Sequence, residues 1–150
     1  MTTRLETEVC VVGGGLVGCA TALHLAMRRV PCIVLERGLC GGQASGVNYG
    51  GVRRQGRSLA ELPLADRARR LWGRLARLVG GDCEFRATGH LRLARDAAEL
   101  AGLERWAAEA RSFGVACDIL GPDRLAERWP WLGPGLAGGS FCADDGQANP

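Results

Sequence analysis

The sequence predicts an α/β fold that opens with two parallel strands joined by a helix. Three observations support this: an apolar run over residues 8–12, apolar residues at helical spacing over residues 16–28, and a second apolar run over residues 30–35. Apolar runs separated by a helix are typical of a parallel βαβ unit with a right-handed crossover. A glycine is expected just past the helix end but none is present; if Arg29 must adopt a left-handed backbone conformation there, the cost is about 1 kcal/mol.

A glycine motif lies between the first strand and the helix. Gly13, Gly15 and Gly18 follow the spacing G-x-G-x-x-G, and Glu36 follows the second apolar run. Gly13 permits a sharp turn, Gly15 leaves room for a pyrophosphate, and Gly18 permits close packing of the helix on the sheet. The start of the helix offers N–H groups to phosphates, and Glu36 can accept hydrogen bonds from ribose hydroxyls. The motif therefore predicts an adenine-dinucleotide site; a glycine turn used for packing alone is the alternative.

The composition is that of an ordinary globular domain. The chain has 150 residues, of which 47% are hydrophobic and 23% are charged, and its net charge is +3. This charge is too small to indicate a nucleic-acid partner or an anionic membrane. No apolar run approaches the roughly 18 residues that a membrane span needs, and the N-terminus does not have the pattern of a signal peptide. We therefore expect a cytoplasmic protein with no nucleic-acid partner and no membrane span.

The cysteines and histidines give no sign of a metal site. None of the seven cysteines forms a C-x2-C pair, which makes a zinc site improbable. An odd number of cysteines without a secretion signal suggests reduced thiols. Cys19, near the helix start, either has a lowered pKa or packs in the core, and packing is the better interpretation. We expect structural roles for His24 and His90.

A long glycine-rich segment separates the second strand from the next predicted helix. Residues 38–57 contain seven glycines and no periodicity, and loops of this length are often functional. Arg53 and Arg54 lie in this segment; they either meet the charge of a bound cofactor or are solvated at the surface. The helix that follows begins either at Ser58, as a capping box, or at Pro63.

The second half of the sequence predicts alternating strands and helices. Gly80-Gly81 ends the preceding helix, and Asp96 is a helix-capping residue. The expected elements are a strand or hairpin over residues 84–94, a helix from Asp96 to Gly114, a short strand over 115–119, a helix from Pro122 to about Trp129, and a strand over 139–143.

These motifs together resemble the D-amino-acid oxidase-like FAD-dependent oxidoreductases, a family that includes sarcosine, glycine and opine oxidases and proline-type dehydrogenases. The resemblance covers nearly the whole chain. It rests on five segments: Gly13–Gly18, Leu35–Gly38, Gly42–Arg53, Gly89–Leu93 and Asp145–Pro150.

The resemblance implies the N-terminal part of a Rossmann-like FAD-binding domain with the start of an α+β substrate domain. Residues 1–82 would form the FAD-binding βαβ unit and the flavin loop, and residues 83–143 would begin the substrate domain. Residues 144–150 would start a helix that returns to the FAD domain. Family members are considerably longer, so the chain resembles an N-terminal fragment. A parallel strand pair alone leaves an edge exposed, and we expect poor stability in isolation.

The resemblance also implies which residues contact FAD. Ser45 matches a pyrophosphate contact, while Gly50, Gly51 and Val52 match backbone that lies against the isoalloxazine ring. Glycines suit this position because a flat ring needs backbone amides without side chains in the way. The implied cofactor-binding residues are Gly13, Gly15, Leu16, Val17, Gly18, Glu36, Arg37, Gln43, Ser45, Asn48, Gly50, Gly51 and Val52.

The implied activity is oxidation of a C–N bond in a small amine or amino acid, with hydride transfer to the flavin. No catalytic residue and no metal ligand can be assigned within residues 1–150, because the family's substrate-binding groups lie later in the chain. The implied partners are the substrate and either a partner subunit or a missing C-terminal part. Two alternatives remain: an NAD(P)-linked dehydrogenase, and a non-catalytic FAD-binding fragment or subunit.

Overall fold

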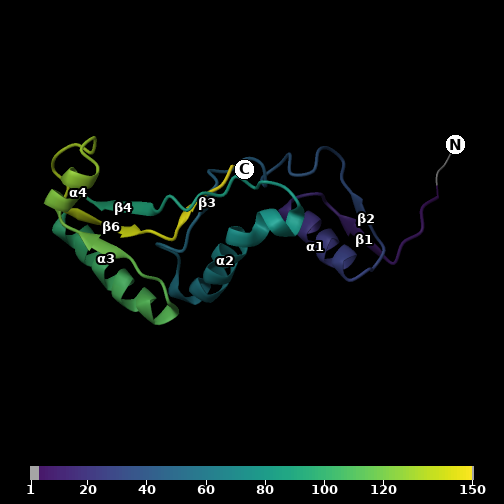
Figure 1. The fold of residues 1–150 in the computed structure, drawn as a ribbon, viewed down its shortest axis with the longest axis horizontal. Helices are drawn as coiled ribbons and strands as arrows, with labels where there is room; N and C mark the ends of the chain where they lie inside the picture. The colour runs from purple at the N-terminus through teal and green to yellow at the C-terminus, as the bar shows by residue number, and fades with distance from the viewer. Residues whose placement is uncertain (1–3, 150) are drawn as a thin grey trace. The chain divides into compact units, whose positions relative to one another are not determined.

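The computed structural model describes residues 4–149, which fall into two compact units that divide between Tyr49 and Gly50. Figure 1 shows the order of the elements along the chain. The α/β class expected from the sequence is confirmed. None of the helices between residues 4 and 149 is both long enough and apolar enough to cross a membrane.

The first unit is the expected parallel βαβ element. Strands β1 (Val9–Val12) and β2 (Cys32–Leu35) pair in parallel from Val9↔Cys32 to Val12↔Leu35, and helix α1 (Leu16–Met27) packs against both. Arg29 follows α1 with φ +59°, so it takes the left-handed conformation at the place where a glycine is usual. Apolar side chains remain exposed in this unit, and Val12 is 84% exposed.

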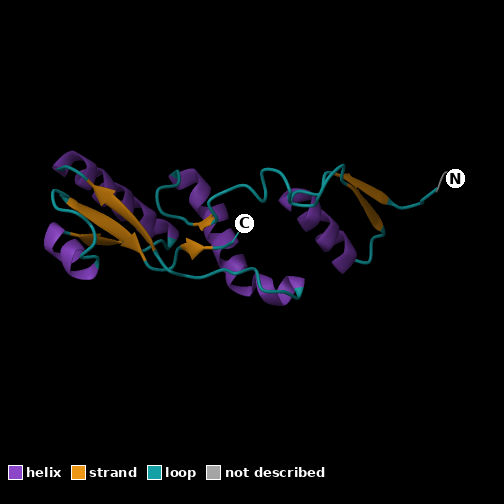
Figure 2. Cartoon of the chain, turned by 90° about the horizontal axis from the view of Figure 1, so that it is seen from above, coloured by secondary structure: helices purple, strands orange, loops and turns teal. Residues whose placement is uncertain are grey.

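The second unit is built on antiparallel strands. Strands β4 (His90–Ala94), β6 (Gly138–Cys142) and β5 (Asp118–Leu120) form a sheet in the order β4-β6-β5, and α3 (Ala97–Ala110) packs on it. Figure 2 shows the strands of this sheet beside the helices. The remaining elements of the unit are β3 (Gly51–Val52), η1 (Leu59–Glu61), α2 (Leu62–Val79), η2 (Arg111–Phe113), α4 (Pro122–Arg128) and β7 (Gly146–Gln147).

The ends of α2 and α3 follow the sequence signals. α2 begins at Leu62 with Pro63 in its first turn, as the Pro63 alternative expects, whereas Ser58 precedes η1, which leads directly into α2, and makes no side-chain cap. Gly80 ends α2 with φ +76°. Asp96 caps α3 as expected, because its side chain accepts the backbone N–H of Glu99 over 2.8 Å.

A hydrophobic core lies between α3 and the antiparallel sheet. Cys117 and Cys142 lie in this core and form a disulfide, with their Cα atoms 4.3 Å apart. The expectation of reduced thiols is therefore wrong for this pair: the antiparallel β5–β6 pairing places the two residues opposite each other, which a count of cysteines cannot reveal. The other buried residues of the cluster are Leu62, Ala107, Ala110 and Val115.

Of two expectations about domain organisation, one differs from the structure and the other stays a prediction. Residues 144–149 were expected to begin a helix, but they form a turn and strand β7, which pairs antiparallel with β3. Pro150, the last residue of that segment, lies outside the described residues. The boundary expected at residue 82 separates residues that serve the cofactor from residues that serve the substrate. The compact units divide at residue 49, which is a different kind of division, so the boundary at residue 82 stays a prediction.

Candidate functional site

The glycine turn of the first unit has the geometry that its sequence predicts. Gly13 has φ +100°, a conformation that favours glycine, and its N–H donates to Leu35 O over 2.8 Å. A Cβ on Gly18 would lie 1.9 Å from Gly13 O and 3.4 Å from Val11 Cγ1. Only glycine therefore allows α1 to approach the turn this closely.

Glu36 joins the end of β2 to this turn. Its Oε2 accepts the N–H of Gly14 over 2.8 Å, and its Oε1 accepts the N–H of Gly38 over 2.8 Å. Hydrogen bonds from the N–H groups of Gly14 and Gly38, with a smaller one from Arg37, lower the pKa of Glu36 below its ordinary value. The carboxylate is thus held ionised and oriented, and each oxygen keeps a lone pair for another donor.

Ser45 lies at the N-terminal end of α1. Its Oγ accepts the N–H of Leu16 over 2.9 Å, and it would lie 3.2 Å from a Cβ on Gly15. The side chain of Asn48 donates to Ser45 O over 2.9 Å. The structure therefore brings Gly15, Leu16, Ser45 and Asn48 together at a helix N-terminus, which is a favourable position for a phosphate.

An open hollow lies at the carboxyl ends of β1 and β2. It has a volume of about 590 Å³, and Val12, Leu35, Glu36 and Arg37 are among the residues that line it. The crevice outside the carboxyl ends of parallel strands is where open α/β sheets bind their ligands. Arg37 and Glu36 thus meet at this hollow. Val17 and Gln43 are exposed, and neither lines it.

The three residues expected at the flavin ring lie in the second unit. Gly51 and Val52 form β3, paired with Gln147 and Gly146 of β7, and Gly50 accepts the N–H of Ala148 over 2.8 Å. Gly50 and Val52 are buried, whereas Gly51 is exposed. The backbone of this short strand is therefore fixed by pairing on one side.

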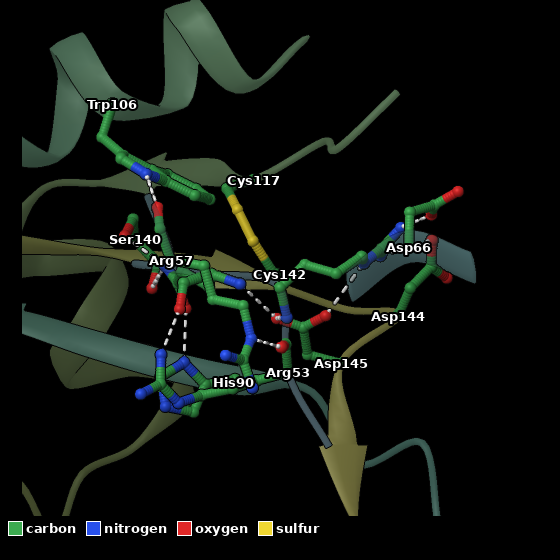
Figure 3. The surroundings of a disulfide bond; sticks show 12 residues. Arg53, Arg57, Asp66, His90, Trp106, Cys117, Ser140, Cys142, Asp144 and Asp145 are labelled. Atoms are coloured by element: carbon green, nitrogen blue, oxygen red, sulfur yellow. Dashed lines mark hydrogen bonds and ion pairs between the residues drawn. A yellow bond between two sulfur atoms is a disulfide. The ribbon is translucent and has the colours of Figure 1, made fainter. Parts of the chain in front are cut away.

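Arg54 is not at the surface, which was one of the two settings expected for it. It is 4% exposed and forms ion pairs with Asp66 at 2.9 Å, Asp145 at 3.1 Å and Asp144 at 3.4 Å; Figure 3 labels these three aspartates. Burial lowers the pKa of Arg54, but hydrogen bonds to Asp145 and Asp66 outweigh it and raise the pKa above its ordinary value. Arg54 is therefore a structural cation, while its exposed neighbour Arg53 donates to Gln55 O over 2.6 Å.

Gln55 extends this network to the antiparallel sheet. Its Nε2 donates to Ser140 O over 3.0 Å, so its Oε1 is the acceptor of the hydrogen bond that His90 Nδ1 donates over 2.7 Å. Burial, and then the charge of Arg53, lower the pKa of His90 below its ordinary value. The sequence patterns do not predict this network. Its only signal was the Asp145-Gly146-Gln147 segment, and ion pairs between residues about 90 positions apart leave no periodic pattern.

The chain is similar to known proteins along almost its whole length. The model of the family described as FAD dependent oxidoreductase matches residues 8–150. An opine oxidase subunit of Rhizobium meliloti is 31% identical over 96% of this chain and 42% of its own length. The crystal structure of glycine oxidase from Geobacillus kaustophilus is 31% identical with a TM-score of 0.88, over 95% of this chain and 40% of that one. The structure of L-proline dehydrogenase from P. horikoshii is 28% identical with a TM-score of 0.86, over 98% and 39%.

Proposed function

The chain belongs to the family of FAD-dependent oxidoreductases, and we propose that it is part of a flavoenzyme that oxidises the C–N bond of a small amine or amino acid. The chain spans about two fifths of the length of relatives such as the opine oxidase subunit and glycine oxidase. Both names denote oxidases of amino compounds, which supports this substrate class. The NAD(P)-linked alternative has no such support among the named relatives.

The observation that carries the proposal is the union of the glycine turn with Glu36. Gly13 turns the chain, Gly18 admits α1 against the turn, and the Gly14 N–H fixes the carboxylate beside the hollow. Glu36 would accept the ribose hydroxyls of FAD, and the helix N-terminus beside Ser45 would hold its pyrophosphate. Bound FAD would supply the hydride acceptor.

The other residues that are expected to contact FAD occur in both units. In the first unit these are Leu16, Val17, Arg37, Gln43 and Asn48, and in the second they are Gly50, Gly51 and Val52. Residues 1–82 would serve the cofactor and residues 83–143 the substrate. The later residues would return to the cofactor domain. The cytoplasmic location stays a prediction.

We assign no catalytic residue within the chain. The relatives are more than twice as long, so the substrate groups and the rest of the cofactor site would come from further sequence or from a partner subunit. The relative from Rhizobium meliloti is itself named a subunit. A non-catalytic FAD-binding subunit is accordingly the second candidate.

Titration with FAD tests the proposal directly. Purified protein is titrated with FAD, and binding is followed by flavin fluorescence and by the rise in unfolding temperature. We expect binding, and we expect Glu36→Gln to weaken it by about tenfold because a charged acceptor is lost. Glu6→Gln, which changes an exposed glutamate paired only with Arg4, is the matched control and should bind like the wild type.

Two results would change the assignment. Stabilisation by NAD and not by FAD would contradict the flavin proposal. Turnover of sarcosine, proline or a D-amino acid by this chain alone would contradict the second candidate, a non-catalytic subunit.

A further inference from the structure

Two free cysteines of the first unit lie against the glycine turn. Cys19 Sγ donates to Gly14 O over 3.3 Å, and Cys40 Sγ lies 2.6 Å from where a Cβ on Gly14 would stand. Both sulfurs thus lie against the same glycine. Because Gly14 has no side chain, there is room for Cys40 beside Cys19.

The pair connects two segments that are distant in sequence. Cys19 lies in the first turn of α1, whereas Cys40 lies in the segment after β2 that carries Ser45. Hydrogen bonds hold that segment to the turn: Gly41 N–H donates to Gly14 O over 2.9 Å, and Leu16 N–H donates to Ser45 Oγ over 2.9 Å. Residues 42–44 are exposed, so little apolar packing adds to these bonds.

Both thiols are open to reagents in solution, but they differ in reactivity. Cys19 and Cys40 are each exposed. Desolvation, and then the neighbouring Cys40, raise the pKa of Cys19 above its ordinary value, which disfavours its thiolate. The raised pKa makes Cys19 a poor first nucleophile, and its contact with Gly14 O places it to attack an oxidised Cys40 in a second step.

We propose that Cys19 and Cys40 form an oxidation site, at which hydrogen peroxide converts the two thiols to a disulfide that ties residues 40–45 to the glycine turn. The Cys40 thiolate attacks peroxide: an S–O bond forms, the O–O bond breaks, and hydroxide leaves with a proton as water. Cys19 sulfur then attacks the Cys40 sulfenic acid, forming the S–S bond and releasing a second water. Two thiols lose two electrons, and one peroxide becomes two waters.

The disulfide has a consequence for the cofactor that rests on the proposed function. Ser45, the expected pyrophosphate contact, lies on the segment that the disulfide would tie down. Release of bound FAD requires this segment to open locally, and a covalent link opposes such opening. FAD should therefore leave the oxidised chain about tenfold more slowly than the reduced chain, within the range that a crosslink contributes to loop closure.

Peptide mapping after peroxide treatment tests the site without reference to FAD. The protein is treated with hydrogen peroxide, alkylated and digested without reductant, so that the Cys117–Cys142 link is identified separately. We expect a Cys19–Cys40 peptide in the wild type and its complete loss in Cys40→Ser. Cys10→Ser changes an exposed cysteine of β1 in the same unit and should leave the link intact. Failure to form the link, or equal pairing of Cys40 with Cys10 or Cys83, would overturn the proposal.

FAD dissociation then tests the tether. Slower release from the oxidised wild type, with no such change in Cys40→Ser, supports it. Equal release rates in a protein whose disulfide has been mapped would overturn the tether. Absence of FAD binding in both states would overturn the proposed function, while a mapped disulfide would still establish the oxidation site.

Discussion

Arg54 and Asp145 form a buried ion pair in which one carboxylate holds both a side chain and the backbone beside it. Arg54 Nε donates to Asp145 Oδ1 over 3.1 Å, while Oδ2 accepts the backbone N–H groups of Arg54 at 3.0 Å and Gln55 at 2.9 Å. Asp145 has 0% exposure. This carboxylate therefore fixes the chain directly after β3, the strand expected to face the flavin.

Removing the charge of Asp145 should destabilise the second unit strongly. We expect Asp145→Asn to lower the free energy of unfolding by about 3 kcal/mol, because the variant leaves a buried arginine with one fewer counter-charge. Urea unfolding measures the change. Asp144→Asn is the matched control: Asp144 pairs with the same arginine at 3.4 Å but is 76% exposed, so its loss should cost less than about 1 kcal/mol. Equal losses in the two variants would contradict the importance of burial.

Gly18→Ala should disrupt the glycine turn. The added Cβ would stand 1.9 Å from Gly13 O, a backbone atom, so the helix or the turn must move. We expect loss of FAD binding in a titration. Gly73→Ala places the same methyl group on α2, where Arg69 Nη1 at 3.9 Å is its nearest neighbour; this control should bind like the wild type and gain up to about 1 kcal/mol of helix stability. Unchanged FAD binding in Gly18→Ala would contradict the role given to the close approach.

Local signals in the sequence were sufficient for the first unit and for the helix ends. The glycine spacing of Gly13 and Gly18 and the cap Asp96 each depend on a few neighbouring residues, and the structure has them in the expected form. Helix starts were less certain where two signals competed, as at Ser58 and Pro63. The proline was the better marker because its fixed φ suits a first turn.

Long-range pairing accounts for what the sequence did not reveal. Cys117 meets Cys142 because β5 and β6 are antiparallel neighbours, and Arg54 meets Asp145 across about 90 residues of chain. From the sequence, Arg54 was expected either at the surface or beside a cofactor, because both settings are common for an arginine near a binding loop.

Loss of the Asp96 cap should weaken α3. The Asp96 side chain accepts the N–H of Glu99 over 2.8 Å, one of the helix donors that otherwise has no partner. We expect Asp96→Ala to lower the free energy of unfolding by about 1 kcal/mol, and Asp96→Ser to restore most of it. Urea unfolding measures both variants. A loss in Asp96→Ser as large as that in Asp96→Ala would contradict a capping role.

The stability of the second unit should fall as His90 takes up a proton. Burial and Arg53 lower the pKa of His90 in the folded chain, so the unfolded chain, with a pKa of about 6.5, binds the proton more tightly. Stability is therefore greatest above about pH 6.5 and falls as the pH drops from there through the folded pKa. Protonation leaves the Gln55 contact in place, since Nδ1 donates in both states, so the loss comes from charging a half-buried ring beside Arg53. Urea unfolding between pH 8 and pH 5 should show a shallower decline for His90→Asn than for the wild type. A wild-type slope in His90→Asn would contradict this account.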